Sequence, residues 1–439
     1  MKKIIIIFLM IYCQQISYGQ NMTALFDTLL NYMHNKYNFD GVVLVADNNL
    51  IIYKKAFGLA NRDWNISNTT DTKFRLGSVS KQFIGFVTLK LAEEGKLKLE
   101  DPVSKYLPGF NSSEKKNITI QNLLTHTSGV FNYTSMPDFN SMVLYQEDSL
   151  VKMIASHKLN FQPSTKYSYS NSNFYLLTVI AEKISGENFE TILKEKILTP
   201  ARMNNSGIEH NDHVLSNRAS PYTFTATGFV NGEYIQMDNV AAGMYSTADD
   251  MMSWSLFMQK QIKSDKFLRA ALQPFHLVDG TTSIYSCGWC LLPDKMMHQG
   301  HINGFANHIS IDTLNRYTVI ILSNDDFKEL FATGKIISSI LHGNNEASNY
   351  LIQKNSSQQL NEYTGVYALG SDTIFNKVEN GELVSYFNGE PLIWKPFAKD
   401  EFFCELFEGN ILFERNKANE IIGTKSFEDY NWIEYKKVK

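Results

Sequence analysis

Ser78 and Lys81 lie three residues apart at the start of an apolar, helix-like stretch. Residues i and i+3 of a helix share a face, so the two side chains can meet. A serine hydroxyl is a poor nucleophile at neutral pH and needs a base beside it. A lysine can be that base when burial lowers its pKa enough to leave the amine neutral. The pair therefore predicts a nucleophile and its base, next to helix N–H groups that can stabilise an oxyanion.

The spacing is weak evidence on its own, because S-x-x-K also occurs at Ser112, Ser113 and Ser149. The first two serines lie in a charged run and the third lies in an ordinary predicted helix. We interpret all three as surface positions. Only Ser78 follows a glycine and begins a buried helix, which suits a desolvated lysine.

Two further stretches carry groups suited to the same chemistry. In Tyr169-Ser-Asn171, the tyrosine hydroxyl can relay a proton and the asparagine amide can hydrogen-bond a substrate amide or ester. Taken alone, these residue types favour a local turn. In His298-Gln-Gly300, a glycine on an edge strand lets a substrate approach the backbone. The two stretches become informative only in combination with Ser78.

The histidines at 298, 301 and 308 invite comparison with a zinc site. Residues 298 and 301 point to opposite faces of an extended chain, and the sequence contains no H-E-x-x-H. We therefore predict no metal and no other cofactor.

Cys287-Gly-Trp-Cys290 has the spacing of a redox or metal-binding pair. It lies within a strand-like run, whereas a thioredoxin-type pair opens a helix. With Cys404 the number of cysteines after position 20 is odd, so a complete disulfide framework is excluded. These cysteines are interpreted as structural.

The elements that must position these residues follow from hydrophobic periodicity. Strands are predicted at 42–46, 50–53, 285–292, 308–312 and 317–322, and helices at 78–95, 118–129, 174–184, 187–203, 251–257 and 330–341. Strands at both ends with helices between them predict an α/β (α+β) fold. Its sheet is built from distant segments, and a helical region is inserted.

A chain of 439 residues is too long for one ordinary domain. We predict a signal peptide at 1–19, a catalytic domain at 20–345, a polar linker at 346–359 and a small antiparallel β domain at 360–439. Short aromatic or β-branched runs and Asn-Gly turns make the last part a barrel or sandwich.

The N-terminus predicts export. Lys2-Lys3 precedes the apolar run from Ile4 to Cys13, and Ser17-Tyr18-Gly19 offers small residues before a cleavage point. The run is shorter than the ~20 apolar residues of a membrane span, so no stable membrane span is expected. Bulky Tyr12 disfavours a lipoprotein, which leaves a periplasmic or secreted protein.

The net charge of −4 comes without a basic stripe, so nucleic acid is not an expected partner. The expected partner is a small-molecule or peptide-like ester or amide. The sequence defines no oligomeric state.

In combination, the three motifs resemble those of the serine β-lactamase and penicillin-binding-protein superfamily. The resemblance is to the branch of class C β-lactamases, D-Ala-D-Ala carboxypeptidases, D-aminopeptidases and related esterases. It covers about residues 25 to 345. Four stretches carry it: Thr72-Lys-Phe-Arg-Leu-Gly-Ser-Val-Ser-Lys81, Gly95-Lys-Leu-Lys-Leu-Glu-Asp-Pro-Val103, Leu123-Leu-Thr-His-Thr-Ser-Gly129 and Gly288-Trp289.

The resemblance implies a β-lactamase/transpeptidase-like fold, with an antiparallel sheet flanked by helices. It makes Ser78 the acylated nucleophile, with Lys81 and Tyr169 sharing its proton. It also implies that Asn171 orients the acyl amide or the lysine.

His298 and Gly300 fall where many members have Lys-Thr-Gly. The resemblance also implies that the backbone N–H groups of Ser78 and His301 form the oxyanion hole. A histidine with an ordinary pKa near 6.5 is mostly neutral at pH 7. Any binding of a substrate carboxylate is therefore expected to weaken as pH rises through the His298 pKa.

The departure at His298 favours the esterase, D-aminopeptidase or amidase side of the family. The first interpretation is an exported serine hydrolase acting through an acyl-enzyme. Two alternatives remain: a β-lactamase or D,D-carboxypeptidase proper, and a penicillin-binding or sensor module that is acylated without turnover.

Overall fold

The computed structural model describes residues 22–343 and 360–438, except 138, 142, 144, 211, 234–242, 328, 371, 388–389, 405–408 and 429. The predicted signal peptide, the linker at 346–359 and the Asn388-Gly389 turn lie outside these residues. The chain forms two compact units. One contains 40–49 and 54–327, and the other contains the described parts of 1–39, 50–53 and 328–439.

A seven-stranded sheet carries one wall of the site, in the order β12-β13-β14-β15-β16-β1-β2. Its strands are β1 (Gly41–Asp47), β2 (Leu50–Phe57), β12 (Tyr285–Ser286), β13 (Trp289–Leu291), β14 (Lys295–Ile302), β15 (Phe305–Asp312) and β16 (Thr318–Ser323). β1 pairs antiparallel with β16, with Gly41 opposite Ser323. The prediction of a sheet built from distant segments is confirmed.

The central strands are buried on both faces, and β1 and β16 are mostly apolar, as such strands are. Every residue of β15 and β16 is buried, as are the first six of β1. β14 and β15 pair from Lys295 opposite Asp312 to Ile302 opposite Phe305. This long ladder holds β14 rigidly in the sheet.

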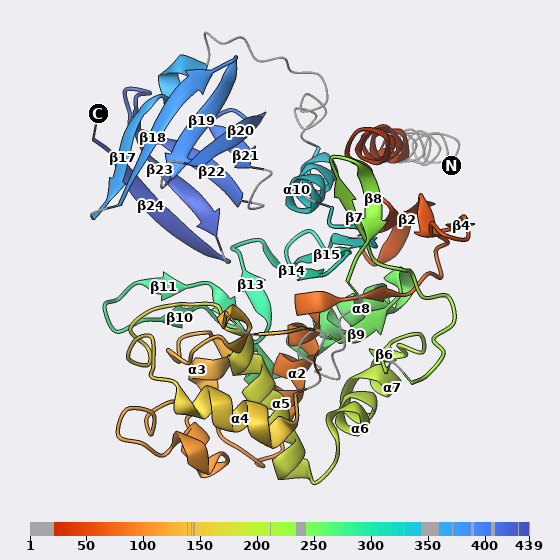
Figure 1. Cartoon of the computed structure of the whole chain (residues 1–439), viewed down its shortest axis with the longest axis vertical. Helices are drawn as coiled ribbons and strands as arrows, with labels where there is room; N and C mark the ends of the chain where they lie inside the picture. Colours follow the sequence, from red (N-terminus) through yellow and green to blue (C-terminus); the bar gives the residue numbers. More distant parts are fainter. Residues whose placement is uncertain are drawn as a thin grey trace, which may run out of the picture. The chain divides into compact units, whose positions relative to one another are not determined.

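The helical region inserted between β1 and β12 is also confirmed. Its helices are α2 (Lys81–Glu93), α3 (Ile120–Leu124), α4 (Glu147–Ser156), α5 (Asn171–Ser185), α6 (Phe189–Leu193), α7 (Thr199–Ala201), α8 (Ala248–Ser264) and α9 (Lys266–Ala271). Figure 1 shows α2, α3, α4 and α5 gathered together, and α5 packs against the other three. Ten of the thirteen residues of α2 are buried, because it is surrounded by other elements.

The predicted strand at 285–292 is wrong as a single element. The chain reverses at Cys287 and Gly288, whose φ angles are +53° and +84°, and forms the two strands β12 and β13. A Cβ on Gly288 would lie 2.4 Å from the carbonyl oxygen of Lys81, so only glycine fits. The turn thus packs against the first turn of α2.

Shorter strand pairs join the helices to the sheet. They are β3 (Leu59–Asn61) with β4 (Ile66–Ser67), β7 (Tyr222–Thr225) with β8 (Gly228–Asn231), and β10 (Phe275–His276) with β11 (Thr282–Ser283). In a further three-stranded sheet, β9 (Met244–Ser246) pairs with β5 (Phe74–Arg75) on one side and with β6 (Gly207–Ile208) on the other. Arg75 on β5 is buried and paired with buried Glu209. Removing one partner of such a pair leaves an uncompensated buried charge. The pair therefore fixes the position of β5, which leads into the turn that contains Ser78.

The C-terminal part of the second unit is a closed eight-stranded barrel (Figure 1). Its strands are β17 (Gly365–Leu369), β18 (Asp372–Glu379), β19 (Glu382–Phe387), β20 (Glu390–Ala398), β21 (Glu401–Cys404), β22 (Gly409–Arg415), β23 (Ile421–Glu428) and β24 (Asn431–Lys437). Each pairs antiparallel with the next, and β17 pairs with β24. Of the two predicted forms, barrel and sandwich, the barrel is the one observed.

Aromatic side chains fill the barrel core, including Tyr363, Trp394 and Phe413. The same unit contains a helix at 22–37 and α10 (Leu330–Leu341), the latter at the predicted bounds. Among the described residues, no helix is both long and apolar enough to cross a bilayer.

Candidate active site

Ser78 and Lys81 meet as their spacing predicts. Ser78 lies in a 3₁₀ turn, η1 (Gly77–Ser80), and Lys81 begins α2 directly after it. The Lys81 Nζ lies 3.0 Å from the Ser78 Oγ, within hydrogen-bond distance. The two residues therefore have the geometry of a nucleophile and its base.

Burial prepares Lys81 for that role. Its side chain is fully buried, and the loss of hydration lowers the pKa of the amine from its usual 10.5 to about 7. A large fraction of the amine is then neutral at physiological pH, which a general base requires. Placing the pair at the start of a helix surrounded by apolar elements produces this shift.

Tyr169 lies beside the pair. It is half-buried in the segment that leads into α5, and the Lys81 Nζ lies 5.1 Å from the centre of its ring. This cation–π distance places the tyrosine ring against the lysine amine. The structure thus brings together the three residues predicted to share one proton.

Asn171 is the first residue of α5. Its side-chain amide donates to the Thr134 Oγ1 at 3.0 Å, and its backbone N–H donates to the Asn132 Oδ1. Among the described residues it makes no hydrogen bond to Lys81. Its predicted part in orienting the acyl amide stays a prediction.

His298 lies on β14, fully buried. Its Nδ1 donates to the Gln299 carbonyl oxygen at 2.5 Å, and its Nε2 accepts from the Tyr285 hydroxyl at 2.9 Å. Both nitrogens are therefore used by a neutral imidazole. Burial, and secondarily the nearby Lys81, lower the His298 pKa to about 3.

The pH dependence expected from an ordinary His298 pKa is therefore wrong. With a pKa of about 3, the imidazole is already neutral at mildly acidic pH. Its pKa differs from the expected value because the sequence alone does not show that the ring is buried beside a lysine.

Gly300 brings β14 against η1, the turn that contains Ser78. A Cβ at this position would lie 2.0 Å from the Leu76 carbonyl oxygen and 3.0 Å from the Ser78 amide nitrogen. A Cβ on Gly77, whose φ is +55°, would likewise lie 2.9 Å from the His301 carbonyl oxygen. The two backbones are thus in direct contact, as an oxyanion hole shared between Ser78 and His301 requires. The side chain of His301 is exposed.

Three residues of the site were not predicted to have a role there. Asn307 on β15 donates to the Arg75 carbonyl oxygen at 2.7 Å, and so ties the sheet to the segment before Ser78. Tyr285 bonds His298, and fully buried His126 packs against Tyr169 and Tyr285. His126 lies in the Leu123–Gly129 stretch that carried the family resemblance, which was the available signal.

The thiols of Cys287 and Cys290 are buried and unbonded to each other, and burial raises the pKa of each to about 12. Such thiols are unreactive. Within the described part of the chain, the histidines at 298, 301 and 308 do not group as metal ligands. The arrangement of Ser78 and Lys81 is suited to nucleophilic attack by the serine hydroxyl.

Comparison with known proteins agrees with this class of site. The chain matches the Beta-lactamase family over residues 23–338. It is 29% identical over 332 residues to penicillin-binding protein 4* of Bacillus subtilis, covering 70% of this chain and 73% of that protein.

Two solved structures share the fold. The octameric penicillin-binding protein homologue from Pyrococcus abyssi has a TM-score of 0.66 at 19% identity, covering 94% of this chain and 99% of that one. A class C β-lactamase in complex with cefoxitin has a TM-score of 0.60 at 22% identity, covering 70% and 95%.

The fold and the serine–lysine site define a protein of the serine hydrolase type. The chain belongs to the β-lactamase family, which includes penicillin-binding-protein homologues.

Proposed function

We propose that the protein is an exported serine hydrolase that cleaves an ester or amide through an acyl-enzyme on Ser78. The observation that carries the proposal is the 3.0 Å separation of the Lys81 Nζ from the Ser78 Oγ, with the amine fully buried. A neutral amine at this distance can take the serine proton as the hydroxyl attacks.

The reaction has two halves. In acylation, the Ser78 Oγ forms a bond to the substrate carbonyl carbon, and its proton passes to Lys81, with Tyr169 taking part in the relay. The bond to the leaving group breaks, and the leaving group departs with a proton returned by the same residues. In deacylation, water forms a bond to the acyl carbon and its proton passes to the relay. The bond between the acyl carbon and the Ser78 Oγ then breaks, the Oγ regains a proton from the relay, and the carboxylic acid product leaves.

The amides of Ser78 and His301 would hold the negative oxygen formed in each half. Each such donor contributes about 10²–10³ in rate. Asn171 would bind the acyl part of the substrate. His298, Gly300 and His301 would form the opposite wall, as the contact of β14 with the turn around Ser78 supports.

Neutral His298 favours substrates without a carboxylate at this wall. A lysine in its place would carry a permanent charge that attracts a carboxylate, whereas this imidazole is uncharged above about pH 3. We therefore place the protein on the esterase, D-aminopeptidase or amidase side of the family. The similarity to a penicillin-binding protein supports one alternative, a β-lactam-binding or hydrolysing protein.

The organisation of the chain is part of the proposal. A signal peptide at 1–19 would direct the protein to the periplasm or the medium. The catalytic domain would occupy 20–345, and a linker at 346–359 would lead to the β domain at 360–439.

Three substrates would show to which branch of the family the activity of the protein belongs. They are a chromogenic cephalosporin, a p-nitrophenyl ester and a D-amino-acid amide. We expect turnover of the ester or amide to exceed that of the cephalosporin by at least about 10²-fold in kcat/KM, because His298 carries no charge. Initial rates at pH 8 measure this, with the Ser78→Ala variant as the control.

Two results of the panel would contradict the proposal. Efficient hydrolysis of the cephalosporin with little ester turnover would make the protein a β-lactamase. One equivalent of released chromophore without further turnover would make it a binding module.

A further inference from the structure

His126 forms the buried back of the site. It belongs to the segment after α3 and is fully inaccessible to solvent. Its ring centre lies 4.4 Å from that of Tyr169 and 4.6 Å from that of Tyr285, and Phe174 packs at 5.1 Å. The imidazole is thus wedged between the catalytic tyrosine and the tyrosine that bonds His298.

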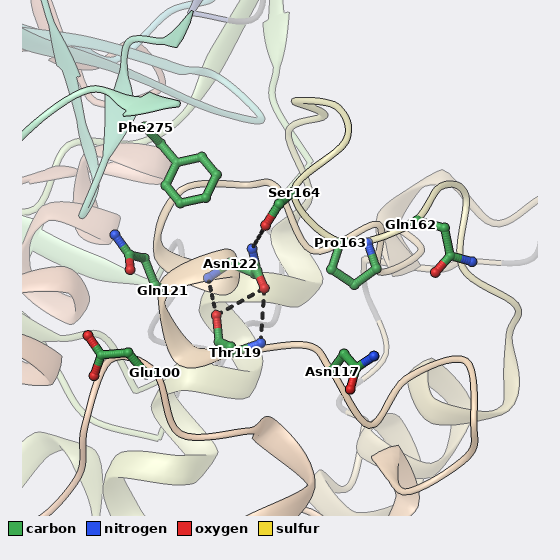
Figure 2. A pocket seen from close by; sticks show the side chains of 9 residues that line it. All are labelled: Glu100, Asn117, Thr119, Gln121, Asn122, Gln162, Pro163, Ser164 and Phe275. Atoms are coloured by element: carbon green, nitrogen blue, oxygen red, sulfur yellow. Dashed lines mark hydrogen bonds between the residues drawn. The ribbon is translucent and has the colours of Figure 1, made fainter. Parts of the chain in front are cut away.

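The backbone of His126 is held in an uncommon conformation. Its φ of +54° lies in the left-handed region, where a histidine residue is strained. Hydrogen bonds on either side maintain it. Asn122 donates to the Thr127 Oγ1. It also donates to the Ser164 Oγ, and a capping box joins it to Thr119 (Figure 2). The segment is therefore anchored firmly enough to hold this geometry.

The hydrogen bonds of His126 define its protonation. Its Nδ1 accepts from the Ser170 backbone N–H at 3.2 Å and lies 3.0 Å from the Asn173 amide nitrogen. The proton of the neutral ring is then on Nε2, which is buried without a hydrogen-bond partner among the described residues. Burial first, and then the charge of Lys81, hold the pKa of His126 well below its usual range.

The ring faces ionisable groups on several elements. They are Lys81 from α2, Tyr167 and Tyr169 from the segment before α5, Tyr285 from β12 and His298 from β14. A charged imidazole among them would repel Lys81, whereas a neutral ring excludes water without adding charge.

We infer that His126 is a positioning residue that holds the Tyr169 ring over the Lys81 amine and keeps water away from it. This inference rests on the proposed function, because it assigns Lys81 and Tyr169 to the proton relay. His126 touches neither the substrate nor Ser78 in this account. It acts through Tyr169, and its removal would allow the tyrosine to tilt away and the lysine to be hydrated.

Two substitutions distinguish the contribution of the His126 ring from the contribution of its hydrogen bond. His126→Asn suits a left-handed backbone and offers an acceptor oxygen, but it removes the ring. His126→Phe keeps an aromatic ring, larger than imidazole by one ring atom, and removes the acceptor. The matched control is His157→Asn, because His157 also stacks on an aromatic ring, that of Phe131, at 4.4 Å.

The readout is the acid limb of kcat/KM for the p-nitrophenyl ester, measured from pH 5 to 10. In the wild type the limb is expected near pH 7, the Lys81 pKa. In His126→Asn we expect it to move up by at least one unit, with a fall of at least about tenfold at pH 6. In His126→Phe and His157→Asn we expect it within about 0.3 units of the wild type.

An unchanged limb in a folded His126→Asn, with only a lower rate, would overturn the inference and leave a structural role. If that variant does not fold, His126→Gln replaces it, with the same expected direction and the same contradicting result. Failure of the proposed function is distinguishable, because it appears as activity that survives in Ser78→Ala, whatever happens at His126.

Discussion

Replacing Lys81 by methionine should abolish turnover and at the same time make the protein more stable. Loss of a general base costs about 10²–10⁴ in rate, and methionine cannot accept the Ser78 proton. Stability should rise because a fully buried amine with a pKa near 7 is disfavoured in the folded state. Methionine fills the same space without a group that needs hydration. We expect a gain on the order of 2–4 kcal/mol at pH 7, given about 1.4 kcal/mol per pKa unit.

The pH dependence of this gain has a defined sign. Between the folded pKa of about 7 and the unfolded value near 10.5, the unfolded chain binds one proton more at Lys81 than the folded chain does. The wild type should therefore become more stable as pH rises through this window, and the variant should not show that contribution. Chemical denaturation at pH 7 and pH 9.5 measures both, and the difference between the two proteins should shrink at the higher pH. A variant that is less stable than the wild type at pH 7 would contradict the account of Lys81.

Gly300→Ala adds one methyl group and should lower activity nearly as much as the replacement of Lys81 does. The added Cβ would lie 2.0 Å from the Leu76 carbonyl oxygen, so β14 and the turn around Ser78 must separate. A displacement of about 1 Å at a reacting group costs on the order of 10²-fold in rate. We expect kcat/KM to fall by at least that factor, and the free energy of unfolding to fall by about 1–3 kcal/mol.

Gly109→Ala is the matched control for this substitution. Its Cβ would meet only the Ala155 side chain, at 3.1 Å, and Gly109 has no positive φ. Kinetics with the p-nitrophenyl ester and denaturation of both variants make the comparison. Full activity in Gly300→Ala would show that the close contact of the two backbones is not needed for catalysis.

The sequence predicted those parts of the fold that hydrophobic periodicity and chain breakers determine. The helix after Ser78, the bounds of α10 and the pairing of distant segments in one sheet are all confirmed. The hairpin of β12 and β13 was missed because Cys287 adopts a positive φ, which its residue type does not indicate. Close packing of Gly288 against Lys81 imposes that turn, and such a contact is tertiary information.

The candidate site was predictable as a set of residue types and not as an electrostatic environment. The meeting of Ser78 and Lys81 follows from helical spacing alone. The neutral state of His298 depends on Tyr285, on the Gln299 carbonyl and on complete burial, none of which the local sequence reveals. His126 belongs to a motif that the sequence shows. Its contact with Tyr169 could not be predicted, because that contact depends on the packing of two segments more than 40 residues apart.

The most direct test of the account is the intact mass of the protein during reaction with a p-nitrophenyl ester, quenched in acid within the first turnovers. The account predicts a mass increase equal to one acyl group in the wild type, located by peptide mapping on Ser78. It predicts no such increase in Ser78→Ala. An acyl group on another residue, or hydrolysis that continues at the wild-type rate in Ser78→Ala, would contradict it.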